Sequence, residues 1–219
     1  MEDEKKLSEK ESLDLITSMI NKAKDSYHDT GWGPIMWGSV IIFCSLFTWA
    51  RVQFGFSFPI DIWWLTAVAI IPQVIMSSRE YKGKGARSYN DIALDYIWIS
   101  FGICVFMLSF SIGMIRDGMD KTFSTQGTPF SKPSNFMYTY QPALFMILYG
   151  LPTFATGGIM KFRPMIFGGI FCWVCAIISL YTPGKTDLLL MAAAALFAWL
   201  IPGILINRMC RQKRLQQHV

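Results

Sequence analysis

The stretch that decides the fold of this chain runs from Ile92 to Ile115 and reads IALDYIWISFGICVFMLSFSIGMI. Asp95 is its only charged residue. The hydrocarbon core of a membrane is about 30 Å thick, and about 20 apolar residues in a helix cross it. The stretch therefore predicts a transmembrane helix, and a second run without any charge, Leu188 to Ile206, predicts another.

Four further apolar segments flank these two along the chain. The six predicted helices cover about 34–54, 59–77, 92–114, 138–160, 164–181 and 187–207. Charged residues make up only 16% of the 219, whereas soluble domains carry about 25%. Membrane strands alternate polar and apolar residues, and these segments do not. The fold class predicted is all-α, a polytopic membrane protein whose six transmembrane helices form three hairpins in a bundle over 32–207.

Lys and Arg are concentrated on one side of the predicted helices. With a cytosolic N-terminus, 15 of the 20 basic residues lie inside and 5 outside. The outer set is Arg51, Arg116, Lys121, Lys132 and Lys185. Because cytoplasmic loops carry the excess of basic residues, both termini are predicted to be cytosolic. The segment Arg116 to Met137 is then an external loop, and residues 208–219 are a basic cytosolic tail that anchors to anionic lipid.

Residues 1–31 precede the first apolar segment as a polar cytosolic head. Ser8 and Glu11 have the spacing of a capping box, which predicts the start of a helix. An apolar stripe follows at helical spacing, formed by Leu13, Ile16, Ile20, Ala23 and Tyr27. The head is predicted to be an amphipathic helix that covers a membrane surface, the protein's own inner face, a second copy or a protein partner.

The three predicted hairpins carry similar residues at similar positions. Their first helices hold Cys44, Cys104 and Cys175, and their second helices hold Pro72, Pro152 and Pro202. Transporter folds are often built from internal repeats, and proline kinks a helix. A threefold repeat would place three kinks at one depth around a shared cavity. The alternative is that proline and small residues are ordinary in membrane helices.

Ionisable or strongly polar residues within membrane segments are functional candidates by default. Asp95 and Gln73 are the candidates for a transport path, together with Pro72, Pro152 and Pro202. Asp61 and Asp187 lie at outer helix ends, where we expect them to be interfacial.

Several chemistries find little support in the sequence. Cys172-Trp173-Val174-Cys175 has redox or metal spacing, but it lies in an apolar helix without a second cysteine pair, so packing is favoured. His28 and His218 are the only histidines, and both lie outside the predicted helices. No phosphate-binding loop or nucleic-acid signature is present. No cofactor, metal or catalytic residue is predicted, and nucleic acid is not expected as a partner.

Three strings support a resemblance to a known family. They are Ser12-Leu13-Asp14-Leu15-Ile16-Thr17, Tyr149-Gly150-Leu151-Pro152-Thr153-Phe154 and Trp199-Leu200-Ile201-Pro202-Gly203. With these the chain resembles, over nearly its whole length, a family of small bacterial six-helix inner-membrane proteins without an assigned activity. The resemblance implies a location in the bacterial inner membrane.

Two classes of function remain open on these grounds. The first is a non-enzymatic regulatory or assembly scaffold that engages a partner through the N-terminal helix. The second is a transporter or channel for a small uncharged or weakly polar solute. An enzyme is a weaker third, since buried histidines and paired carboxylates are missing.

Overall fold

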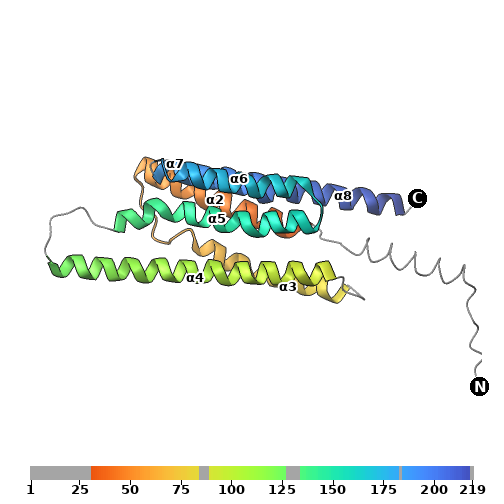
Figure 1. Ribbon diagram of the computed structural model, residues 1–219, viewed down its shortest axis with the longest axis horizontal. Helices are drawn as coiled ribbons and strands as arrows, with labels where there is room; N and C mark the ends of the chain where they lie inside the picture. Colours follow the sequence, from red (N-terminus) through yellow and green to blue (C-terminus); the bar gives the residue numbers. More distant parts are fainter. Residues whose placement is uncertain (1–30, 84–88, 127–133, 183, 218–219) are drawn as a thin grey trace, which may run out of the picture.

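The computed structural model describes residues 31–83, 89–126, 134–182 and 184–217, and within these ranges it contains helices and no strand. The all-α fold class is thereby confirmed. The helices are α2 (Trp32–Phe54), α3 (Trp64–Gly83), α4 (Tyr89–Gln126), α5 (Ser134–Ile159), α6 (Arg163–Ser179), α7 (Gly184–Ala195), the π-helical segment η1 (Leu196–Leu200) and α8 (Ile201–Gln217). The last three follow one another without a break (Figure 1).

Four helices are long and apolar enough to cross a membrane. They are Trp32–Phe54, Tyr89–Met119, Tyr140–Ile159 and Gly184–Gln212. Helix α6 is apolar but has only 17 residues, and α3 ends in a polar turn after Met76. The chain is therefore a helical protein with several membrane-compatible helices. Of the six predicted spans, four meet these criteria among the described residues.

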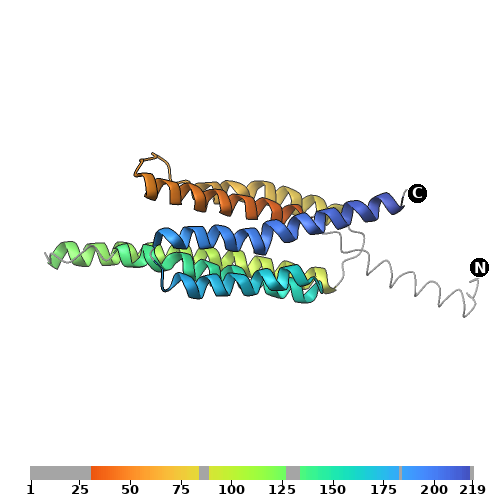
Figure 2. The same cartoon turned by 90° about the horizontal axis from the view of Figure 1, so that it is seen from above.

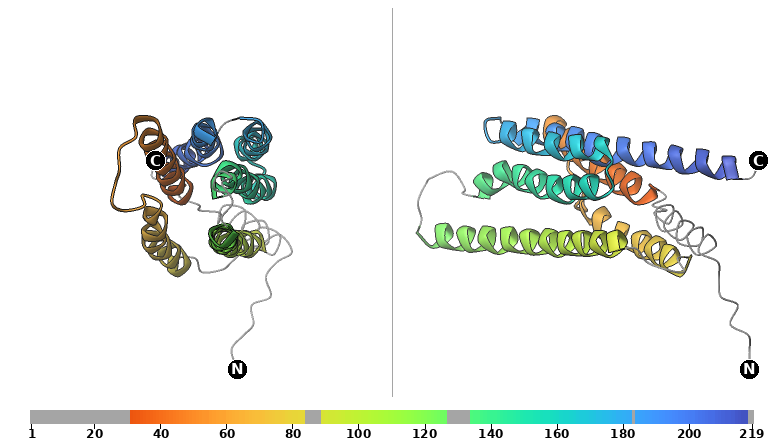
Figure 3. Two further views of the ribbon diagram at one scale, coloured as in Figure 1. Left: turned by 90° about the vertical axis from the view of Figure 1, so that its left-hand side faces the viewer. Right: turned by 45° about the vertical axis from the view of Figure 1, so that its right-hand side comes forward.

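The helices associate as a packed group with two peripheral members. Helices α5 and α6 make the most extensive contact, and α2 packs along α7, η1 and α8. Seen end-on, α2, α5, α6 and the last helix surround a common centre (Figure 3, left). Met146, Cys172 and Trp199 belong to the core cluster at that centre and have almost no exposed surface. The core of the protein lies among these four helices.

Small residues allow the close helix crossings in this group. A Cβ added to Gly38 of α2 would lie 2.8 Å from the backbone nitrogen of Leu200. A Cβ on Gly168 of α6 would lie 2.7 Å from the Cα of Ala198. Helices in membranes gain much of their association from such backbone approach at small residues. Both crossings meet η1, so the π-helical segment is held from two sides.

Helices α3 and α4 are at the periphery and do not contact each other. Helix α3 packs on α2, whereas α4 packs on α5 and reaches Trp199 of η1 with the rings of Trp98 and Phe101. Figure 2 shows them apart from each other, and the end-on view shows both on the same side of the packed helices (Figure 3, left). Consecutive elements are usually neighbours in space. These two helices instead leave a side of the bundle where their apolar surfaces are unpaired.

Helix ends differ from the sequence boundaries mainly on the polar side. Helix α4 continues to Gln126 and α5 begins at Ser134, so much of the predicted loop from Arg116 to Met137 is helical. Apolar content marks where a helix can lie in lipid, whereas backbone hydrogen bonding continues into polar sequence. The predicted N-terminal helix, with Leu13, Ile16, Ile20, Ala23 and Tyr27, lies outside the described residues.

The residues that suggested a threefold repeat are in unlike environments. Cys44 and Cys175 are buried, whereas Cys104 is exposed. Pro152 and Pro202 are buried in the core, whereas Pro72 is exposed on α3. Only two of the three prolines of the predicted repeat are therefore buried in the packed group, and Pro72 does not share their environment.

Candidate functional site

The most irregular backbone in the core is the π-helical segment η1, directly before Pro202. The backbone N–H of Ile201 donates to the carbonyl of Leu196, which is the wider hydrogen-bond spacing of a π-helix. Such segments are rare and frequent at functional sites. The segment carries Trp199, which is 2% exposed despite its size. The wide turn brings this indole into the centre of the bundle.

Trp199 meets a hydroxyl group of α5 there. Its Nε1–H donates to Oγ1 of Thr153 over 2.8 Å, and the Thr153 hydroxyl donates to the Tyr149 carbonyl over 2.7 Å. The Thr153 hydroxyl therefore both accepts and donates a hydrogen bond. Pro152, the residue before Thr153, has no N–H and is itself buried. A kink-prone position of α5 thus faces the irregular segment of the last helix.

Aromatic rings close around this hydrogen bond. Tyr149 and Trp199 have ring centroids 4.8 Å apart. Trp98 and Phe101 reach them from α4, with centroids 6.3 and 6.1 Å from that of Trp199. Stacked and edge-on aromatic pairs at such distances are attractive. The cluster fills the space between α4, α5 and η1 with side chains.

A line of hydroxyl groups runs along the same face of α5. Tyr149, Thr153 and Thr156 lie three or four residues apart and are all buried. The Thr156 Oγ1 is buried without a hydrogen-bond partner. A buried hydroxyl without a partner is uncommon and costs free energy. The face is therefore the most polar one in this part of the core.

A second buried polar cluster joins α6 and α7. Asp187 is 0% exposed, and its Oδ1 lies 2.5 Å from Oγ1 of Thr182. Its Oδ2 and the hydroxyl of Ser179 are both buried and without a partner. Asp187 lies at a helix end, as expected, but it is buried within the protein instead of being exposed there. The hydroxyls of Thr182 and Ser179 replace water around the carboxyl group, and α2 packs along α7.

The predicted transport residues are placed apart. Gln73 is partly buried and its Oε1 accepts a hydrogen bond from Nε1 of Trp37 over 3.1 Å. Asp95 is exposed on α4. Because α3 and α4 make no contact, the structure does not bring these two residues together. Gln73 ties α3 to α2 through an indole.

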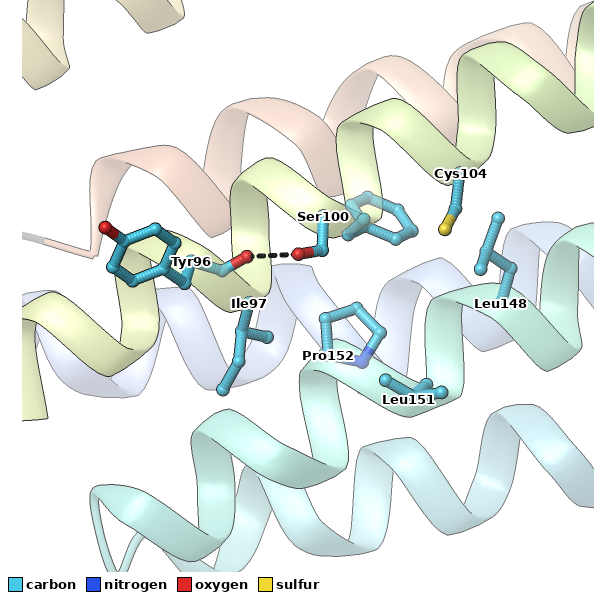
Figure 4. A pocket seen from close by; sticks show the side chains of 8 residues that line it. Tyr96, Ile97, Ser100, Cys104, Leu148, Leu151 and Pro152 are labelled. Atoms are coloured by element: carbon cyan, nitrogen blue, oxygen red, sulfur yellow. Dashed lines mark hydrogen bonds between the residues drawn. The ribbon is translucent and has the colours of Figure 1, made fainter.

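The groove between α4 and α5 is apolar. It measures about 260 Å³. Figure 4 shows its lining, which is Tyr96, Ile97, Ser100, Phe101, Cys104, Leu148, Leu151 and Pro152. Its lining carries the hydroxyls of Ser100 and Tyr96, and that of Ser100 donates to the Tyr96 carbonyl. The groove offers little polar chemistry to a solute.

The cysteines of the CxxC spacing pack inside the bundle. Cys172 and Cys175 are buried, and Cys172 Sγ lies 3.9 Å from the carbonyl of Ala194. Within the described part of the chain, no group of three His, Cys, Asp or Glu residues is arranged to hold a metal ion. The environment of this pair fits helix packing.

Two features were not found by reasoning on the sequence. The π-helical turn at Trp199 has no composition signal apart from Pro202, which follows it. The burial of Asp187 could have been suspected from Ser179 and Thr182, whose hydroxyls lie close to it along the chain. Comparisons with models of protein families, with curated proteins and with solved structures find nothing that matches this chain. The resemblance to a bacterial inner-membrane family stays a prediction.

Proposed function

We propose that this chain is a non-enzymatic scaffold that crosses the bacterial inner membrane six times and organises a partner protein there. Both termini are cytosolic in this proposal, and the helices form three consecutive hairpins. Four helices suited to crossing support it, as does the short apolar helix α6. The basic residues at the ends of the helices supply the orientation.

The observation that carries the proposal is the separation of α3 and α4. Helix α3 packs on α2, and α4 packs on α5 with additional ring contacts to Trp199, but the two helices do not contact each other. Their exposed apolar side chains include Val68, Ile71 and Ile75 on α3 and Phe106 and Phe110 on α4. The core, in contrast, is closed by packed aromatic rings at Trp199. A protein with a filled centre and two unpaired membrane helices is suited to hold another membrane helix.

Photocrosslinking tests this in the membrane. A photoreactive amino acid is placed at Ile71 of α3, at Phe106 of α4 and, as a control, at Phe167 of α6, all of which are exposed. Helix α6 contacts neither α3 nor α4. The proposal predicts one protein adduct shared by Ile71 and Phe106 and lipid adducts alone at Phe167. Lipid adducts alone at all three positions would reject it.

The N-terminal segment is the second contact in this proposal. Its apolar stripe would bind the partner at the cytosolic surface. Replacing Ile16 and Ile20 by Glu should weaken the adduct formed from Ile71. Replacing Thr17 and Asn21, on the polar face, by Glu adds the same charge and should leave it. If both variants and a chain lacking residues 1–27 give the same yield of adduct from Ile71, the N-terminal segment does not contribute to partner binding.

A transporter for a small uncharged or weakly polar solute is the second candidate. The buried hydroxyl line on α5 favours it, because Thr156 has a buried hydroxyl without a partner one turn after the buried Pro152. Proteoliposomes exposed to an excess of glycerol or urea test it by their rate of reswelling. Faster reswelling than protein-free liposomes, slowed by Thr156→Val, would support transport. Rates equal to those of protein-free liposomes would exclude these solutes.

A further inference from the structure

Among the described residues, Asp187 is a completely buried carboxyl group to which no cationic side chain is paired. It lies in the first turn of α7. The nearest basic residue along the helix, Lys185, is directed elsewhere. Lys185 Nζ instead lies 3.5 Å from Oε1 of Gln53. An ionised carboxylate in such a place is very costly unless something neutralises it.

The Thr182 hydroxyl can accept a hydrogen bond from a protonated Asp187. It lies 2.5 Å from Oδ1 of Asp187 and 3.3 Å from the carbonyl of Ile178. A hydroxyl has one hydrogen to donate, and the Ile178 carbonyl also accepts from the backbone N–H of Tyr181 over 3.0 Å. If Asp187 carries a proton on Oδ1, it donates to Thr182, and Thr182 donates to Ile178. The burial of the carboxyl group, and not the number of hydroxyl hydrogens, favours this neutral form.

The other side of the carboxyl group is consistent with this arrangement. Oδ2 of a neutral carboxyl group is a carbonyl oxygen that needs one donor. The hydroxyl of Ser179 is buried next to it, 1% exposed, and has no other partner. Its hydrogen can rotate toward Oδ2, because a hydroxyl hydrogen turns to suit its acceptor. Ser179, Asp187, Thr182 and Ile178 then form one continuous chain.

We propose that Asp187 is a proton-binding site, in which the neutral carboxyl group bridges the hydroxyls of Ser179 and Thr182 and ties α6 to α7. The ligand of this site is a proton, and it is independent of any partner on α3 and α4. Release of the proton leaves an uncompensated negative charge buried between α6 and α7.

Infrared spectroscopy of the full chain in detergent at neutral pH tests the site. A protonated carboxyl group gives a carbonyl stretching band that an ionised carboxylate lacks. We expect this band in the unmodified protein and its loss in Asp187→Asn. Asp61→Asn is the matched control, since Asp61 is exposed and accepts a hydrogen bond from the Trp63 backbone. It should leave the band unchanged.

A second variant keeps the test decisive if Asp187→Asn does not fold. Ser179→Ala removes the donor to the carbonyl oxygen, so the band should remain and move to higher frequency. Absence of the band from the unmodified protein would overturn the proposal. So would a rise in melting temperature with sodium, but not with choline, that Asp187→Asn abolishes, because the site would then hold a sodium ion.

Discussion

At the scale of single residues, the core depends on a few polar contacts between apolar helices. The hydrogen bond from Trp199 to Thr153 is the central one, since it joins the irregular turn of the last helix to the kink-prone part of α5. Lipid provides no hydrophobic drive between helices, so packing and such bonds hold them together. In the sequence, the only indication of this bond is that Trp199 comes shortly before Pro202.

A double-mutant cycle measures this bond. Trp199→Phe keeps a ring but removes the donor, and Thr153→Val removes the acceptor at constant shape. Interhelical hydrogen bonds in membranes couple by about 0.6 kcal/mol on average, and we expect a coupling of that order here. Unfolding of the two single variants and the double variant in mixed micelles gives the value. Strictly additive losses would mean that the bond does not form.

Gly38 provides a second test at this scale. Gly38→Ala places a Cβ against the backbone of Leu200, which neither side can avoid without moving a helix. We expect a loss of about 1–3 kcal/mol in the free energy of unfolding, as for other overpacked sites. Gly102→Ala in α4 is the control, because nothing lies within 4 Å of its added Cβ. Equal stability of the two variants would contradict the crossing of α2 and η1.

At the scale of elements, sequence patterns predicted the existence and order of the helices well. Runs of apolar residues are long, and a helix is the simplest way to satisfy the backbone in lipid. The patterns did not predict the features that depend on how one helix packs against another. The even apolarity of α4 did not reveal that it would lie at the periphery, while Ala-rich α7 is central. The burial of Asp187 also depends on α2 and α6, which no local pattern describes.

Deleting Phe197 tests the role of η1. One residue fewer converts the wide turn into an α-helical turn, so the side chains of that turn, Trp199 among them, change direction. Trp199 then loses its contacts with Thr153 and Tyr149, so a large drop in melting temperature is expected. Phe197→Ala is the control; it loses the ring contact with Phe171, 4.9 Å between centroids, and should cost about 1 kcal/mol. Equal melting temperatures of the two variants would show that the wide turn is dispensable.

At the scale of the whole molecule, the protein combines a core filled with side chains and a side where the apolar surfaces of α3 and α4 are unpaired. The packed helices α2, α5, α6 and α7–α8 supply stability, and α3 and α4 are left to contact lipid or a partner. The proton-binding site at Asp187 lies in the packed group and is separate from that side. The proposed function requires that the long axis of the bundle crosses a membrane with its basic helix ends in the cytosol.

Labelling with a membrane-impermeant maleimide tests that arrangement most directly. The native Cys210, near the end of α8, reports the proposed cytosolic side, and Lys185→Cys, exposed at the start of α7, reports the outer side. The test uses intact bacteria whose outer membrane has been made permeable. With the N-terminus and the C-terminus in the cytosol, we expect the Lys185→Cys variant to be labelled at position 185. We expect Cys210 to stay unlabelled until the inner membrane is opened. Labelling of both positions before that step, or of Cys210 alone, would contradict it.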